Sequence, residues 1–114
     1  MRYQQQKSGV IDTRTTLVWM DTKQSLTYHE ALEHADRVSQ ETGLPWRVPT
    51  LDELLTLIDW TRVGPATSFP GMESSTVWTA TLYRGTEDVW YLDTHTGVVG
   101  YTYPNESNAT FLVR

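Results

Sequence analysis

The segment 46–50, Trp-Arg-Val-Pro-Thr, limits what this chain can fold into more than any other stretch. Pro49 fixes its own φ angle and biases Val48 toward an extended conformation, so the chain crosses this segment as a short straight piece. Thr50 is a good N-cap, and Glu53 three residues later completes a Thr-x-x-Glu capping box. The sequence therefore predicts that one helix ends before the segment and that another begins at its end.

Arg47 lies between two apolar residues of this extended piece. Alternation places Trp46 and Val48 on one side and Arg47 on the other. An arginine beside an acid-rich helix start is more often a pairing group than a ligand contact, so we expect it to bind the carboxylate of Glu53 or Asp52, or a carbonyl elsewhere in the fold. The residues predicted to be structural are Trp46, Arg47, Pro49, Thr50 and Glu53.

Two helices are predicted, each opened by a capping box. The first begins after Thr27, with Glu30 closing its box, and it ends before Gly43, because glycine favours the C′ position and Pro45 prevents continuation. The second is predicted over residues 51–60. The apolar stripes have helical spacing and consist of Tyr28, Ala31, Leu32, Ala35 and Val38 in the first helix, and of Leu51, Leu54, Leu55 and Ile58 in the second.

The remaining segments are typical of strands and turns. Before the helices, the sequence predicts an edge strand at 2–6, an extended piece with a turn at Asp12 over 10–16, a strand at 17–20 and a loop at 21–25. After them, residues 63–75 form a long irregular loop. Short connections then favour an antiparallel meander of four strands, at 76–83, 89–93, 98–103 and 110–113. The order of elements predicts an α+β domain.

The size and the missing cysteines set broad limits. A chain of 114 residues indicates a single domain, 1–114. The absence of cysteine excludes a disulfide framework, a thiolate metal site and a cysteine nucleophile. The N-terminus lacks the apolar core of a signal peptide, and no apolar run reaches transmembrane length. We therefore expect a cytoplasmic protein without membrane contact, or an extracellular one if the chain is part of a longer or separately exported product.

The net charge of −5 is concentrated in one part of the chain. Residues 28–59 hold seven acids against Arg37 and Arg47, and the other segments balance. This pattern argues against nucleic-acid binding, which needs a basic patch. It leaves two alternatives, a solvated helix face, which is the more common case, or a surface for a basic protein partner. Under the second alternative, the candidate contacts are Glu33 and Glu41.

Several stretches together resemble one known family. The most specific is the segment Trp-Arg-Val-Pro-Thr-Leu-Asp-Glu-Leu at 46–54, and the supporting stretches lie at 15–19, 27–31, 77–81 and 111–114. From residue 10 to the C-terminus the chain is similar to the Lcl C-terminal-like domain, named for a bacterial collagen-like adhesin. The resemblance implies a C-type-lectin-like fold, related to the sulfatase-modifying-factor group, with two helices packed on a small antiparallel sheet and a long loop that carries ligand contacts.

The chain also departs from the family pattern. Thr79-Ala80-Thr81 follows Trp78 where the family favours serines, and the closing strand lacks the usual cysteine. No Glu-Pro-Asn, Gln-Pro-Asp or Trp-Asn-Asp triplet is present, so the calcium-dependent sugar site of true C-type lectins has no support. Without cysteine, the copper-dependent oxidase chemistry of the formylglycine-generating relatives has none either. The resemblance thus implies a fold and surface recognition, and no cofactor is predicted.

The aromatic residues are the main candidates for ligand contacts. Five Trp and six Tyr are more than a core of this size needs. Alternation puts Trp90 on the opposite face of its strand from Tyr91, so aromatic surface is offered to both sides of the sheet. One side must be core, and the other is a candidate platform for a sugar ring or a protein. The predicted ligand-binding residues are Tyr83, Arg84, Trp90, Tyr101 and Tyr103.

Two constellations could carry chemistry, and both have a plainer interpretation. Glu30 and His34 have i, i+4 spacing and could share a metal, but a solvated charge pair is the more common reason for this spacing, and no metal site is predicted. His95 and Asp93, with Ser74 or Ser75, could be drawn as a triad. No nucleophile-elbow or oxyanion motif accompanies them, so no catalytic residues are predicted.

The sequence favours a non-enzymatic recognition module over an enzyme. The first hypothesis is a module that binds a protein partner, for example as a small inhibitor or accessory protein of a bacterium or phage, through the loop 63–75 and the aromatic strands. The alternative is a glycan-binding domain, as the resemblance to an adhesin implies, in which tryptophan and tyrosine rings stack on sugars.

Overall fold

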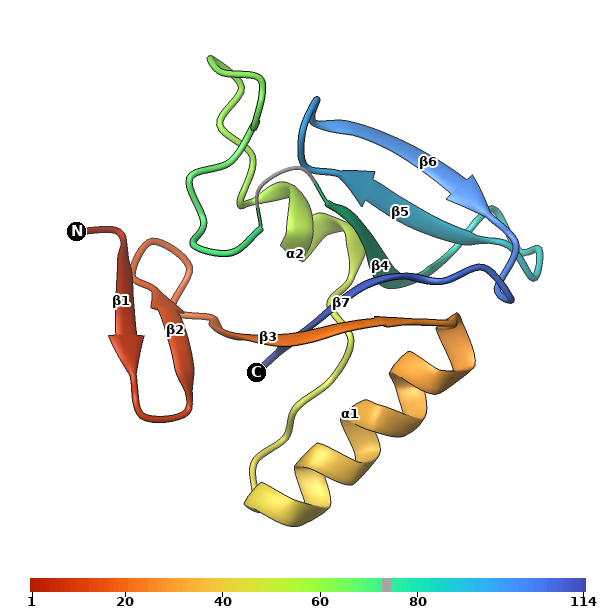
Figure 1. Cartoon of the computed structure of the whole chain (residues 1–114), viewed down its shortest axis with the longest axis horizontal. Coiled ribbons are helices and arrows are strands. Elements are labelled where there is room, and N and C mark those ends of the chain that lie inside the picture. The colour runs from red at the N-terminus through yellow and green to blue at the C-terminus, as the bar shows by residue number, and fades with distance from the viewer. Residues whose placement is uncertain (73–74) are drawn as a thin grey trace.

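The computed structural model describes residues 1–72 and 75–114. Within these residues the chain forms seven strands and two helices (Figure 1). In chain order they are β1 (Tyr3–Gln6), β2 (Gly9–Asp12), β3 (Val18–Leu26), α1 (Tyr28–Thr42), α2 (Leu51–Leu55), β4 (Thr76–Leu82), β5 (Val89–Asp93), β6 (Val98–Thr102) and β7 (Asn108–Val113).

The strands form one mixed sheet in the order β1-β2-β3-β7-β4-β5-β6. Neighbours are antiparallel except β4 and β7, which are parallel and pair at Val77 and Ala109. The expected C-type-lectin-like arrangement of two helices on a small antiparallel sheet is therefore wrong, because the fold consists mostly of a seven-stranded mixed sheet. The predicted meander holds only for β4, β5 and β6. The last strand does not follow β6 at the edge but returns to the middle of the sheet.

The polar residues 21–25, predicted to be a loop, belong to β3. They continue the pairing with β7, from Asp21 opposite Phe111 to Ser25 opposite Ala109, with a bulge between. Lys23 at the bulge has a positive φ of 57°, and the Asp21 side chain accepts a hydrogen bond of 2.8 Å from its backbone N–H. The prediction failed because the stretch has no apolar alternation and its strand conformation depends on β7.

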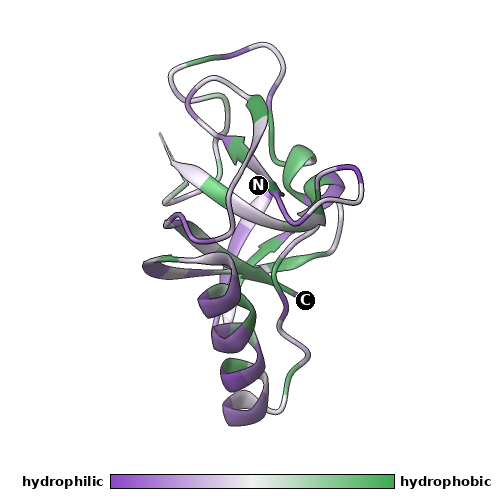
Figure 2. Cartoon of the chain, turned by 90° about the vertical axis from the view of Figure 1, so that its right-hand side faces the viewer, coloured by the Kyte–Doolittle hydropathy of each residue, from purple (hydrophilic) through white to green (hydrophobic). Residues whose placement is uncertain are grey.

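The two faces of the sheet are covered by different elements. On one face, α1 packs against alternate strand residues such as Val18, Trp78 and Leu112. On the other, α2 and the loop that follows it pack against Trp19 and Phe111. Figure 1 shows α1 on one side of β3 and α2 on the other, and Figure 2 shows that the outward side of α1 is largely hydrophilic. The molecule thus has three layers with two cores.

Both predicted capping boxes are present, but the second helix is shorter than expected. The first helix ends at Gly43, whose φ of 71° is left-handed, as predicted for a C′ glycine. The second ends at Leu55 instead of residue 60. Its apolar stripe continues into the core, but the N–H of Asp59 donates to the carbonyl of Ala66 at 2.8 Å, which turns the backbone away from the helix.

The loop 63–75 is not an open surface loop over its described part. Ala66, Phe69 and Met72 are buried in the core beside α2. The Phe69 ring makes edge contacts with Tyr3, Trp19 and Phe111, at centroid distances of 5.1, 6.1 and 6.2 Å. Residues 73–74, which the prediction included, lie outside the described residues. The described part of the loop therefore mainly covers the core on the α2 side of the sheet.

The segment 46–50 connects the helices to the centre of the sheet. The backbone of Arg47 exchanges two hydrogen bonds with Val113, of 3.0 and 2.8 Å, and the carbonyl of Pro49 accepts one of 2.7 Å from Ala80. The Arg47 guanidinium binds the Glu53 carboxylate through two bonds of 2.5 and 2.6 Å. This bond is the main reason that the pKa of Glu53 is lowered. Trp46 is buried, with the guanidinium of Arg114 5.0 Å from its ring centroid.

A partly buried ion pair near the N-terminus was not predicted from the sequence. Arg2 donates two bonds of 2.9 Å to the carboxylate of Asp12, which is fully buried, and one of 2.6 Å to the carbonyl of Thr56. Burial acts to raise the pKa of Asp12, but the hydrogen bonds from Arg2 and from the backbone of Arg14 outweigh it and lower the pKa. The pair joins β1, β2 and the end of α2.

Replacing Arg47 with alanine should lower the free energy of unfolding by about 1 kcal/mol, because the lost ion pair is bidentate but partly exposed. Urea denaturation checks this, with Arg37→Ala on the exposed side of α1 as the control. An Arg47→Ala variant with unchanged stability and altered ligand binding would make Arg47 a ligand contact instead.

Replacing Asp12 with asparagine should cost about 2 kcal/mol at pH 7, because it leaves the partly buried Arg2 without its counter-charge. Since the folded state lowers the pKa of Asp12, the stabilisation is present above its unfolded value of about 3.9 and is lost as the pH falls through the folded value. Urea midpoints of the two proteins should therefore converge toward low pH. Asp36→Asn, an exposed acid on α1, should show no such difference.

Candidate functional site

Three aromatic rings pack together beside the turn between β4 and β5. Trp90 and Tyr101 are opposite each other on β5 and β6, and Tyr83 follows β4. The rings of Tyr83 and Tyr101 are stacked, with centroids 3.7 Å apart and an angle of 13°. Trp90 meets both edge-on, at 5.1 Å from Tyr83 and 5.9 Å from Tyr101. We call Tyr83, Trp90 and Tyr101 the aromatic cluster.

Arg84 is held against this cluster by the geometry of the turn. The N–H of Tyr83 donates to the carbonyl of Asp88 at 2.8 Å, and Thr86 returns two bonds to the carbonyl of Tyr83. Arg84 and Gly85 both have positive φ angles, 45° and 78°, which reverse the chain tightly. The Arg84 guanidinium lies 5.4 Å from the centroid of the Tyr83 ring, in cation–π contact.

The two tyrosine hydroxyls of the cluster interact electrostatically. A hydrogen bond with the Tyr83 hydroxyl is the main cause that raises the pKa of Tyr101, and the negative charge of Asp88 acts in the same direction. Because this bond favours the neutral phenol of Tyr101, it raises the pKa of that hydroxyl, which presents a polar group at the rim of an apolar surface.

The structure brings together four of the seven predicted ligand residues. Tyr83, Arg84, Trp90 and Tyr101 form one surface, on which Tyr101 is 49% exposed. Tyr103 lies past the end of β6, is 66% exposed, and makes no ring contact with another described aromatic residue. The other two predicted residues, Glu33 and Glu41 on α1, lie elsewhere. Trp90 shares a face of β5 with Leu92, which packs in the core on the α2 side of the sheet, whereas α1 covers the opposite face.

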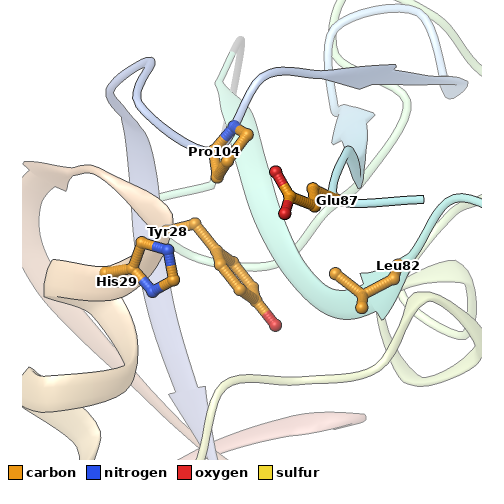
Figure 3. A pocket seen from close by; sticks show the side chains of 5 residues that line it. All are labelled: Tyr28, His29, Leu82, Glu87 and Pro104. Atoms are coloured by element: carbon orange, nitrogen blue, oxygen red, sulfur yellow. The ribbon is translucent and has the colours of Figure 1, made fainter. Parts of the chain in front are cut away.

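A cavity of about 250 Å³ lies on the other side of the β4–β5 turn. Its lining comes from the start of α1, the end of β4, the turn and the segment after β6 (Figure 3). The N–H of Tyr28 donates to the carbonyl of Pro104 at 3.0 Å, which fixes the helix start against that segment. Burial raises the pKa of Tyr28, whose ring also meets Trp78 edge-on at 6.0 Å. The lining residues are Tyr28, His29, Leu82, Glu87 and Pro104.

Sequence reasoning missed this cavity. Tyr28 was assigned to the apolar stripe of the helix, and Glu87 was given no role. The lining residues come from three separate parts of the chain, 28–29, 82–87 and 104, and no local motif marks them. The signal available beforehand was a large aromatic residue at the first position of a capped helix, where its ring reaches beyond the helix end.

The sequence model of the Lcl C-terminal domain family matches residues 8–114. The chain belongs to this family. A comparison with curated proteins gives no match. The match includes the segment 46–50, the aromatic cluster and the cavity, so both candidate surfaces are parts of an Lcl C-terminal domain.

The Glu30 and His34 pair considered for a metal makes other contacts in this Lcl C-terminal domain. Glu30 is used by the capping box, where it accepts a bond of 2.9 Å from the backbone of Thr27, and the His34 ring contacts Arg37 at 3.3 Å. Among the described residues, no group of three or more acidic or histidine side chains is placed to hold a metal ion.

The residues considered for a triad take part in backbone contacts. The Asp93 carboxylate accepts a bond of 2.9 Å from the backbone N–H of His95, and the N–H of Ser75 donates to the Thr94 hydroxyl at 2.9 Å. Ser74 lies outside the described residues.

In the part of the chain that the structure describes, no helix is long and apolar enough to cross a membrane.

The hydroxyl contact in the cluster predicts a specific titration. In Tyr83→Phe the ring stack remains but the hydrogen bond is lost, so the pKa of Tyr101 should fall toward the ordinary value of about 10. NMR of protein labelled at the tyrosine ζ carbons resolves the individual residues. Tyr103→Phe is the matched control and should leave the Tyr101 titration unchanged, while an unaltered value in Tyr83→Phe would show that the hydroxyls do not interact.

Proposed function

We propose that this Lcl C-terminal domain is a non-enzymatic recognition module that binds a protein partner through a surface centred on the β4–β5 turn. The observation that carries the proposal is the aromatic cluster with Arg84 upon it. Tyr83 and Tyr101 cover a face of each other, and the guanidinium lies over the Tyr83 ring. The surface therefore offers a rigid block of tyrosine, tryptophan and arginine, the residue types that dominate the binding energy of protein interfaces.

The rigidity of the cluster supports a protein ligand in a second way. Binding costs free energy for every side chain that must be ordered, and rings already packed together have little freedom left to lose. The exposed edge of Tyr101 and the hydroxyl pair add polar groups, which suit the rim of an interface. Such a surface would suit this domain to act on its partner as a small inhibitor or accessory protein.

A glycan is the alternative ligand, and a separate observation favours it. Tyr103 stands outside the cluster with two thirds of its surface exposed, so its ring is open for stacking on a sugar. The two proposals thus depend on different tyrosines.

The experiment that separates them is capture of a partner by tagged protein from lysate of the native host, with a glycan array run on the same preparation. Tyr101→Ala and Arg84→Glu should each weaken capture of one enriched protein at least about tenfold, the loss of one interface hot spot. Trp60→Ala is the matched control, because this residue is 73% exposed in a different loop.

The outcomes that would contradict the first proposal are distinct. Capture that is equal in all three variants would remove the cluster as the binding surface. A clean array signal that disappears in Tyr103→Ala, without a captured protein, would establish the glycan alternative. Near-ultraviolet circular dichroism of each variant verifies that the fold is intact.

A further inference from the structure

The cavity between α1 and the β4–β5 turn is lined by the carboxylate of the exposed residue Glu87, which forms no ion pair with a described cation. Neither the carboxylate of Glu87 nor the hydroxyl of Tyr28 has a hydrogen-bond or ion-pair partner among the described residues. None of the five lining residues is lysine or arginine. A bound group with hydrogen-bond donors and positive charge would therefore complete the site.

Part of the cavity wall is apolar. The side chains of Leu82 and Pro104 lie along the Tyr28 ring together with Glu87, and His29 lies on the helix side (Figure 3). An alkyl stem can pack on the first two, while a cation at its end lies near both a carboxylate and an aromatic ring. A ring and a carboxylate together attract cations through the ring quadrupole and a charge-assisted hydrogen bond.

The surroundings favour a cation as well. Counting along α1 from His29, positions i+4 and i+7 are Glu33 and Asp36, so carboxylates continue the same face of the helix away from the cavity. The chain as a whole carries a charge of −5. A basic ligand is attracted to this side of the molecule, and an anionic one is repelled.

We propose that this cavity binds the cationic side chain of a lysine or arginine supplied by the protein partner. The inference rests on the proposed function and deepens it, because it states which chemistry the partner presents beside the β4–β5 turn. The partner's alkyl stem packs between Leu82 and Pro104, and its charged end binds the Glu87 carboxylate over the Tyr28 ring.

The test is an NMR titration of the full chain, labelled with ¹⁵N, with three Nα-acetyl amino-acid methylamides. Those of lysine and arginine are the cationic probes, and that of norleucine has an alkyl stem without charge. Backbone signals of residues 28–29 and 82–88 should shift saturably with at least one cationic probe, at an affinity about tenfold or more above that for norleucine. The stronger of the two cationic probes identifies the side chain.

Two variants of equal charge test the assignment to Glu87. Glu87→Gln should weaken the affinity for the cationic probe about tenfold. Glu106→Gln removes the same charge from an exposed residue that does not line the cavity, and it should leave the affinity unchanged. Equal binding of norleucine, unchanged binding in Glu87→Gln, or equal weakening in Glu106→Gln would each overturn the proposal. So would shifts of the same signals by a neutral methyl glycoside without shifts by the cationic probes.

The failure of this inference is distinguishable from failure of the proposed function. If partner capture depends on Tyr101 and Arg84 but no cationic probe binds, the cavity proposal alone is wrong. If the probes bind and capture does not depend on the cluster, the cavity remains a site for a basic side chain, and the partner surface must be sought around it instead.

Discussion

The insertion of β7 between β3 and β4 is the constraint on which the rest of the structure depends. Without this strand, the sheet would divide into β1–β3 and the meander β4–β6. The C-terminus is fixed to the start of β3 there, since Val18 and Arg114 exchange two backbone hydrogen bonds of 2.9 Å. Alternate residues of β7 enter both cores: Phe111 and Val113 pack under α2, and Leu112 packs under α1. A single strand thereby fixes the relative position of both helices, and the bridge from Val113 to Arg47 extends this control to the segment between them.

The candidate surfaces inherit their geometry from this arrangement. The meander β4–β6 presents the aromatic cluster on one side of its turn, and the cavity needs α1 on the other. The meander and β3, the strand that leads into α1, lie on opposite sides of β7 in the sheet. The hydrogen bond from the N–H of Tyr28 to the carbonyl of Pro104 then holds the start of α1 against the segment after β6, at the cavity. Residues far apart in the chain, such as His29 and Glu87, line one cavity because β7, the last strand in the chain, lies at the centre of the sheet.

Local features were predictable from the sequence, and long-range ones were not. The capping boxes at Thr27 and Thr50 and the left-handed Gly43 follow from interactions within a few residues. Alternation placed Trp90 and Tyr91 on opposite faces of their strand, but it does not reveal which strands are neighbours, so the contact of Trp90 with Tyr101 was not predicted. The parallel pairing of β7 with β4 is a tertiary choice, and the polar bulge around Lys23 is a strand only because β7 lies beside it. The cavity depends on these same long-range pairings, so no local pattern marks it.

The size of the aromatic cluster limits what it can do alone. A stable protein interface buries about 800 Å² on each partner, which is more than three clustered rings offer. A partner seated on the β4–β5 turn must therefore extend beyond the cluster, and the direction with complementary chemistry leads over the turn to Glu87 and the acids of α1. A rigid apolar patch supplies affinity, whereas a charge in a partly apolar cavity selects the partner that carries the opposite charge. Since the short turn of residues 83–88 separates the two features, one partner element can reach both. The same turn that holds Arg84 against Tyr83 also places Glu87 at the cavity, so under the proposed function its conformation affects both contacts with the partner.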